Sequence, residues 1–213
     1  MRRTILALLI CVSFAGCSKA ASEASGAEKL GTDTAYYNDC LGVSFTIPRA
    51  WWLNNTNKNN LSESKGEVTD YLSMDIGYGI YEGRAYSIIW LASFSNMERS
   101  SQKSHLGFNI EARSLSNVEG MADFMRYFEY SMLKPSENGE YKLIESEQIT
   151  IKGRVFEIRV YLVSQDDVDF RMMTMSCEAR NDFFFNVFAD YWPQNTKAKQ
   201  TVIDTVSKAI DFY

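Results

Sequence analysis

Histidine is the scarcest reactive group in this sequence: among 213 residues only His105 occurs, in the polar stretch Ser104-His105-Leu106. One imidazole is a poor basis for a Ser-His-Asp or Cys-His catalytic set, and a histidine metal site needs several imidazoles or a carboxylate cluster. The sequence also lacks a Walker loop and a G-x-G-x-x-G fingerprint. We therefore expect no catalytic residues, no metal site and no cofactor, and we interpret His105 as a surface residue.

Basic residues are too few for nucleic-acid binding. The chain has 22 Lys and Arg against 27 Asp and Glu, a net charge of -5, and removal of Arg2 and Arg3 with a leader lowers this to -7. No cluster of Lys and Arg offsets the negative charge, so the domain repels phosphates. We exclude DNA and RNA as partners.

Proline is also rare, with only Pro48, Pro135 and Pro193, all near expected element ends. What is abundant is apolar: 46% of the residues are hydrophobic, enough for a core, and 14% are aromatic, which favours a sheet-rich protein. The length predicts one globular domain, over residues 34–213.

The first residues have the pattern of an export signal. Arg2 and Arg3 precede a ten-residue apolar stretch, residues 5–14, that only Ser13 interrupts. A bilayer core needs about 20 apolar residues, so this stretch is too short to span one and fits a signal peptide over residues 1–16.

Phe14-Ala15-Gly16-Cys17 resembles the bacterial lipobox, in which Leu, a small residue and Gly or Ala precede the cysteine; Phe14 replaces the usual Leu. The resemblance implies signal cleavage between Gly16 and Cys17 and lipidation of Cys17. Two or three acyl chains anchor a protein stably on a membrane. The alternative is an ordinary secretory leader with an incidental cysteine.

Residues 17–33 are small and polar without an apolar period, which predicts a flexible tether reaching on the order of 20 Å. Ser18 and Lys19 follow the cysteine, and in enteric-type bacteria the absence of Asp there indicates delivery to the outer membrane. We expect a cell-envelope protein whose lipid-anchored domain faces the periplasm or the cell surface.

The remaining sequence predicts strands and two helices. Apolar residues alternate over 43–47 and 72–80, and residues 86–94 are apolar on both faces, as in a central strand. A hairpin turn is expected over residues 38–42. A long strand over residues 149–163, in which Gly153 marks a turn or bulge, is expected to form an antiparallel meander with strands over 168–177 and 183–189, through turns at Asp166-Asp167 and at Asn181-Asp182. Ser116 and Glu119 resemble a capping box before an amphipathic helix that extends to Lys134, and a second helix covers residues 198–210.

The segment Gly42-Val-Ser-Phe45-Thr-Ile47-Pro48-x-x-Trp51 resembles the opening of PsbP/Mog1-like domains, including the DcrB-type bacterial lipoproteins. The run Ile151-Lys-Gly153-Arg-Val-Phe156-Glu and the final hairpin, helix and Ile210-Asp-Phe212 also look like those domains. The resemblance implies an α+β fold, an α/β/α sandwich with a central antiparallel sheet. It implies no shared catalytic residues, since members mostly act as binding or assembly factors.

Cys40 and Cys177 remain as an even pair once Cys17 is lipidated, and an oxidising compartment favours a disulfide between them. Such a bond would be worth about 4 kcal/mol on the loop-entropy model. The alternative is two unpaired buried thiols.

Three tryptophans are candidates for a partner surface: Trp51 and Trp52 follow Pro48, and Trp192 precedes Pro193. The alternative for these rings is packing in the core. Two other groups are interpreted as structural. Asp166, Asp167 and Asp169 fit a solvated turn better than a calcium loop, and the Met-rich strand at Met172 fits a core better than a soft-metal site.

These observations predict a non-enzymatic, membrane-anchored binding or assembly module whose partners are the membrane and another envelope protein. The alternatives are a lipoprotein that carries a small ligand or hydrolyses one, with a pocket near residues 62–70, and a surface-exposed host-contact lipoprotein.

Overall fold

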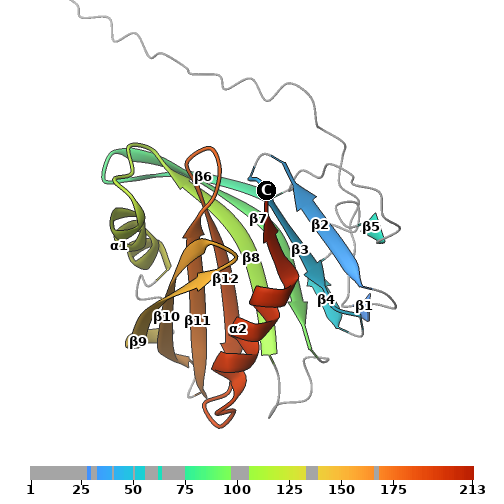
Figure 1. Cartoon of the computed structure of the whole chain (residues 1–213). Helices are drawn as coiled ribbons and strands as arrows, with labels where there is room; N and C mark the ends of the chain where they lie inside the picture. The colour runs from blue at the N-terminus through green and yellow to red at the C-terminus, as the bar shows by residue number, and fades with distance from the viewer. Residues whose placement is uncertain are drawn as a thin grey trace, which may run out of the picture.

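The computed structural model describes residues 28–29, 33–39, 41–49, 51–55, 62–63, 75–96, 106–132, 139–165 and 168–213 (Figure 1). The elements in chain order are β1 (Glu28–Lys29), β2 (Thr34–Asn38), β3 (Val43–Ile47), β4 (Trp52–Asn55), β5 (Ser62–Glu63), β6 (Asp75–Tyr81), β7 (Arg84–Ser95), β8 (Leu106–Leu115), α1 (Met121–Met132), β9 (Gly139–Ile151), β10 (Arg154–Gln165), β11 (Val168–Glu178), β12 (Phe183–Tyr191), α2 (Ala198–Ala209) and β13 (Ile210–Phe212).

The strands form two sheets. The larger has the order β1-β4-β7-β8-β12-β11-β10-β9, with β6 also paired to β7, and the smaller has the order β13-β3-β2-β5. Every pairing among the described strands is antiparallel. Successive strands β9, β10, β11 and β12 pair side by side and form an antiparallel meander. The turn at Lys152 and Gly153 divides the long strand expected over residues 149–163 between β9 and β10.

The two faces of the large sheet are covered by different elements, as the alternation along β12 shows. Phe184 and Phe188 pack in a cluster with α1, while Phe185 and Val187 pack in the main core with α2 and the small sheet. Figure 1 accordingly places α1 and α2 on opposite sides of the large sheet. The α+β fold with a central antiparallel sheet, predicted from the sequence, is confirmed.

Three predicted turns are present, and each contains residues with positive φ. Gly42, between β2 and β3, has a φ of +61°, and an added Cβ there would lie 2.8 Å from the carbonyl oxygen of Tyr213. Asn181 and Asp182 both have positive φ, the geometry of a tight hairpin turn. Gly153 forms the β9–β10 turn with Lys152; the residues at 166 and 167 lie outside the described part.

The predicted capping box does not form. The Ser116 hydroxyl accepts a hydrogen bond from the backbone N–H of Ala85 at 2.9 Å, so it serves β7 instead of the helix. The helix begins at Met121, after Gly120 with a φ of +94°, and the Asp123 carboxylate accepts the backbone N–H of Glu119 at 3.1 Å. Asp123 therefore takes the role expected of Glu119, that of a carboxylate reaching back to a backbone N–H ahead of the helix.

Several strands were not expected, among them β1, β4, β5, β8 and the first part of β9. β8 lies in the centre of the large sheet, between β7 and β12. β1 falls within the predicted tether, where Glu28 pairs with Leu53 and Lys29 with Trp52, so the end of that segment joins the sheet edge.

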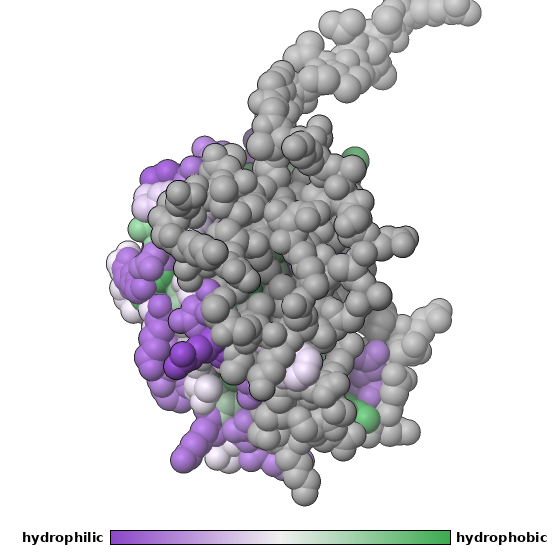
Figure 2. Space-filling model, turned by 90° about the vertical axis from the view of Figure 1, so that its right-hand side faces the viewer, coloured by the Kyte–Doolittle hydropathy of each residue, from purple (hydrophilic) through white to green (hydrophobic). Residues whose placement is uncertain are grey.

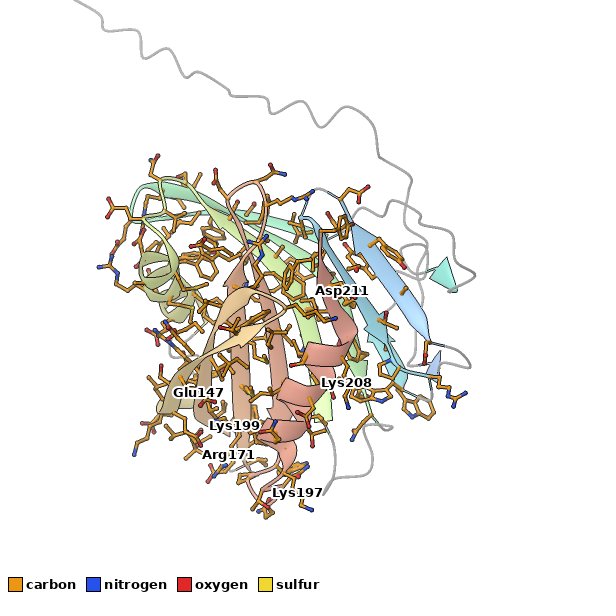
Figure 3. The ribbon with its side chains drawn as sticks, in the orientation of Figure 1. Glu147, Arg171, Lys197, Lys199, Lys208 and Asp211 are labelled. Atoms are coloured by element: carbon orange, nitrogen blue, oxygen red, sulfur yellow. The ribbon has the colours of Figure 1, made fainter. Side chains whose placement is uncertain are left out.

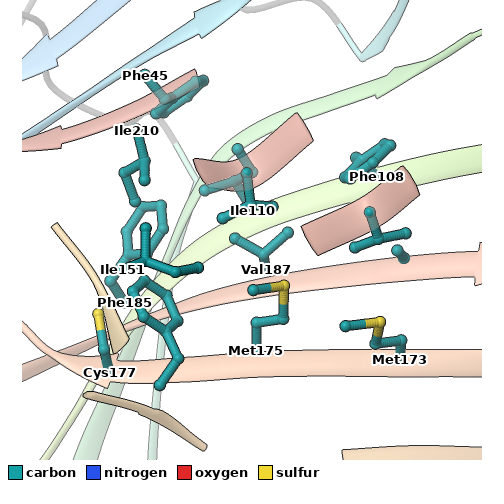
Figure 4. Packing of buried hydrophobic residues seen from close by; sticks show 14 of the residues in the cluster. Phe45, Phe108, Ile110, Ile151, Met173, Met175, Cys177, Phe185, Val187 and Ile210 are labelled. Carbon is teal, nitrogen blue, oxygen red and sulfur yellow. The ribbon is translucent and has the colours of Figure 1, made fainter. Parts of the chain in front are cut away.

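The core face of β11 carries Met173, Met175 and Cys177, all fully buried. Figure 4 shows the three side chains along one strand, with Cys177 beside Phe185 and Ile151. The expectation that the Met-rich strand fills a core is confirmed.

Helix α2 is tied to the edge of the large sheet by charge. The Lys199 ammonium lies 2.5 Å from Glu145 and 2.9 Å from Glu147, both on β9 (Figure 3). The described residues visible in Figure 2 are mostly hydrophilic, with hydrophobic residues in isolated positions.

Candidate functional site

Several residues singled out in the sequence lie outside the described residues. They are Gly16, Cys17, Cys40, His105, Asp166 and Asp167, together with most of the loop at residues 62–70 that was expected to cover a pocket. Lipidation and signal cleavage therefore stay predictions. Asp169 is described, and its carboxylate accepts the Ser164 hydroxyl at 2.6 Å, which fits a turn.

Cys177 carries a free thiol in the structure, but its predicted disulfide partner Cys40 lies outside the described residues, so the disulfide stays a prediction. Cys177 shares the core-facing side of β11 with Met175 and is fully buried. Burial raises the pKa of the Cys177 thiol, so this group is a poor nucleophile.

The predicted tryptophan surface is only partly assembled. Trp51 is half-buried and packs on the rings of Phe94 and Phe108, at centroid distances of 5.6 and 5.3 Å. Its ring therefore belongs to the core, as in the alternative interpretation. Trp52, on β4, and Trp192, directly after β12, are also half-buried at the same end of the large sheet, but β7 and β8 lie between β4 and β12.

The main sheet also encloses a small apolar cavity on its α2 side. Its lining includes Phe45, Phe94, Phe108, Val206 and Ile210. A ligand site of ordinary kind adds a few converging polar groups to such a lining. The polar residues of its lining are Thr46 and Thr205, and no charged side chain of the described residues lines it.

The polar groups are concentrated on the opposite face, beneath α1. Glu111 and Arg113 of β8 form an ion pair, and each side chain is only 4% exposed. In the sheet, Glu111 lies directly opposite Asn186 of β12, and Asn186 lies opposite Ser176 of β11. Thr174 lies two positions further along β11, and these five residues are here called the α1 cluster.

Burial governs the chemistry of the α1 cluster. It raises the pKa of the Glu111 carboxyl, and the nearby Arg113 guanidinium opposes this shift. Burial also raises the pKa of the Tyr127 phenol, on α1, to about 12, again against the effect of Arg113. Arg113 therefore faces both Glu111 and Tyr127, and its guanidinium lies 5.1 Å from the ring centroid of Phe128.

Helix α1 is held over this cluster at both ends. Near its start, Asp123 is paired with Arg84 at 2.6 Å, which lowers the pKa of the Asp123 carboxyl. Near its end, Glu129 is paired with Arg159 of β10 and accepts the hydroxyl of Tyr161 at 3.1 Å. Between the two clamps, Phe124 stacks on Phe184 and Phe128 on Phe188.

The α1 cluster was not identified from the sequence, although a signal for its strand exists. Leu106, Phe108, Ile110 and Ala112 alternate with Gly107, Asn109, Glu111 and Arg113, the period of a strand with one apolar face. That pattern assigns Glu111 and Arg113 to a solvent-facing side, and only the docking of α1 buries them.

No protein-family model matches this chain, and no curated protein matches it in sequence. Its fold is similar to the solution structure of cyanobacterial PsbP (CyanoP) from Synechocystis sp. PCC 6803, with a TM-score of 0.51 and 12% identity over 90% of this chain and 98% of that one. A crystal structure of PA94, a protein of unknown function from Pseudomonas aeruginosa, matches with a TM-score of 0.41 and 14% identity over 83% of this chain and 94% of that one. The first similarity shows a PsbP-like fold. Neither described helix is long and apolar enough to cross a membrane.

Proposed function

We propose that the protein is a lipid-anchored lipoprotein of the bacterial cell envelope whose domain binds another envelope protein without catalysing a reaction. The observation that carries the proposal is Phe14-Ala15-Gly16-Cys17 directly after a short apolar stretch. A cysteine in this position is the acceptor for the lipids that hold such proteins on a membrane.

The position of β1 in the sequence limits how far the domain can lie from the membrane when Cys17 is lipidated. Ten residues, 18–27, separate Cys17 from Glu28, the first residue of β1. A fully extended chain of this length spans at most about 35 Å. With Cys17 lipidated, the edge of the large sheet formed by β1 and β4 works within that distance of the bilayer.

The binding role rests on the resemblance to PsbP/Mog1-like domains, whose members mostly act as binding or assembly factors. Fold alone does not fix a function, so the role needs its own test.

Mass spectrometry of the mature N-terminus tests the anchor. We expect the native protein to begin at Cys17 and to carry a diacylglyceryl group, and metabolic labelling with a palmitate analogue to mark the wild type. Cys17→Ser is the matched control and should lose both the label and the cleavage before residue 17. An unmodified cysteine, or cleavage elsewhere, contradicts the anchor.

Crosslinking in intact cells, followed by purification of the native lipoprotein, tests the binding role. We expect one envelope protein to be recovered repeatedly, and recovered less when the same domain is exported without its lipid. Repeatedly empty recoveries across growth conditions contradict the role. Protease shaving of whole cells separates a periplasmic domain, which is protected, from a surface-exposed one.

A further inference from the structure

Three buried side chains beneath α1 have hydrogen-bonding atoms with no partner among the described residues. They are the hydroxyl of Thr174, the hydroxyl of Ser176 and the side-chain oxygen of Asn186, and all three residues are fully buried. The amide nitrogen of Asn186 is satisfied, since it donates to the carbonyl of Phe184 at 3.2 Å. The unmet hydrogen-bonding capacity of the sheet here therefore lies in three oxygens on two adjacent strands, and the buried Tyr127 hydroxyl of α1, which covers this face, is also without a hydrogen-bond partner among the described residues.

The neighbouring strand carries a partly exposed carboxylate whose oxygens do have hydrogen-bond partners. Glu157 of β10 lies directly opposite Ser176, and its two carboxylate oxygens accept bonds from Gln148 at 3.0 Å and from Ser146 at 3.3 Å. Buried polar atoms are almost always paired with protein or with ordered water, because an orphaned atom costs free energy. Three orphaned oxygens in one place therefore point to an occupant.

The occupant has to be enclosed by α1. Asn186 lies between Phe184 and Phe188 on the same face of β12, and both rings are covered by rings from α1. Phe124 stacks on Phe184 with centroids 3.9 Å apart, and Phe128 stacks on Phe188 at 5.5 Å. The rings of α1 therefore cover the Asn186 side of the three oxygens.

Charge and size limit what the site can hold. Glu111 and Arg113 neutralise each other beside it, so an ion would add an uncompensated buried charge. Directly opposite side chains in a sheet start about 5 Å apart, and alternate residues on one strand lie about 7 Å apart. A molecule that spans these oxygens is small and both donates and accepts hydrogen bonds.

We propose that Thr174, Ser176 and Asn186 form an enclosed binding site for a small neutral hydroxyl compound, held between α1 and the large sheet. Ordered water and a small polyol share this chemistry, and the experiments below distinguish them. The site is independent of the proposed anchor and partner, so either proposal can fail without the other.

Thermal unfolding of the full-length protein in detergent tests whether the site is occupied. The direction in which a substitution changes the Tm differs between an occupied and an empty site. Thr174→Val and Ser176→Ala remove hydroxyls at nearly constant shape. If the hydroxyls hold an occupant, both variants lower the Tm; if the site is dry, removing an orphaned polar atom raises the Tm. Thr150→Val is the matched control, because Thr150 is exposed on β9, and it should shift the Tm little. A raised Tm in both variants overturns the proposal.

A high-resolution crystal structure of the full chain, grown without polyols, tests the site directly. We expect density for one or more small molecules within hydrogen-bond distance of the three oxygens. Empty space there, with the two hydroxyls bonded to protein groups, overturns the proposal. The source is then assigned by titrating glycerol and ethylene glycol. A saturable rise in Tm that Ser176→Ala abolishes identifies a polyol site, and density without a saturable rise identifies ordered water.

Discussion

The rings of Phe124 and Phe184 lie parallel, with an interplanar angle of 7° and centroids 3.9 Å apart. This stack joins α1 to β12 and closes one side of the α1 cluster. Both side chains are almost fully buried, at 0% and 3% exposure. The contact is thus one of the apolar attachments of a helix that also covers buried polar groups.

Truncating this stack should loosen α1. We expect Phe124→Ala to lower the free energy of unfolding by about 3–5 kcal/mol, the cost of emptying a buried aromatic site. Urea denaturation gives the measurement. Tyr130→Ala, on the same helix, is the control and should cost clearly less because its ring is 51% exposed. Equal losses in the two variants would contradict the assignment of Phe124 as a buried apolar contact.

The ion pair at the start of α1 should make stability depend on pH. The Arg84 guanidinium, followed by the Glu119 backbone N–H, lowers the pKa of Asp123 below its ordinary value of 3.8. The stabilisation is therefore present above that ordinary value and is lost as pH falls through the lower, folded-state pKa. We expect Asp123→Asn to reduce the Tm at pH 7 and to differ less from the wild type at pH 3.

The control for this pH series is Asp211→Asn, which breaks an exposed ion pair with Lys152. Exposed pairs contribute little, so its effect on Tm should be small at every pH. A constant offset between Asp123→Asn and the wild type from pH 7 to pH 3 would count against the role of the Arg84–Asp123 pair.

Cys177 should be chemically silent in the folded protein. The residue is fully buried and its pKa is raised, and only an accessible thiolate reacts with a disulfide reagent. In a Cys40→Ser background we expect no modification of Cys177 under native conditions and complete modification in denaturant. In the wild type, denaturation without reductant leaves Cys177 reactive if it is a free thiol, and unreactive if the disulfide predicted from the sequence forms in the cell.

Two glycines with positive φ, Gly42 and Gly153, allow the cost of backbone strain to be measured separately from the cost of steric crowding. Gly153 has open space around it, whereas an added Cβ at Gly42 would lie 2.5 Å from the Arg180 side chain and 2.8 Å from the backbone of Tyr213. We expect Gly153→Ala to destabilise by about 1 kcal/mol through backbone strain, and Gly42→Ala to cost more. Chemical denaturation compares them, and a Gly42→Ala variant as stable as Gly153→Ala would rule out the crowding.

The elements that sequence patterns predicted well are those defined by local chemistry. The hairpin around Gly42 and the turn at Asn181-Asp182 follow from residues that tolerate positive φ. The second helix follows from apolar spacing over residues 198–210, where Ala198, Val202 and Val206 are buried. Each of these features depends on residues close together in the chain.

The features that were missed depend on distant residues. The start of α1 is decided by Ala85, which takes the Ser116 hydroxyl, and by Arg84, which pairs with Asp123. The α1 cluster exists because α1 docks on the polar face of β8, a choice that the alternation at Glu111 and Arg113 does not reveal. Packing of one element on another overrides local preference in both cases.

The small sheet also constrains the order of folding during synthesis. Its strand β13 pairs with β3, and the Tyr213 hydroxyl donates to Asp39 at 2.7 Å across a sequence separation of 174 residues. Contacts between segments so far apart form late, because the intervening loop has to close first. The hairpin of β2 and β3 therefore gains its last strand only after synthesis has passed residue 212. If the chain is exported as proposed, its domain is still incompletely folded when the leader emerges, which favours translocation as an unfolded polypeptide.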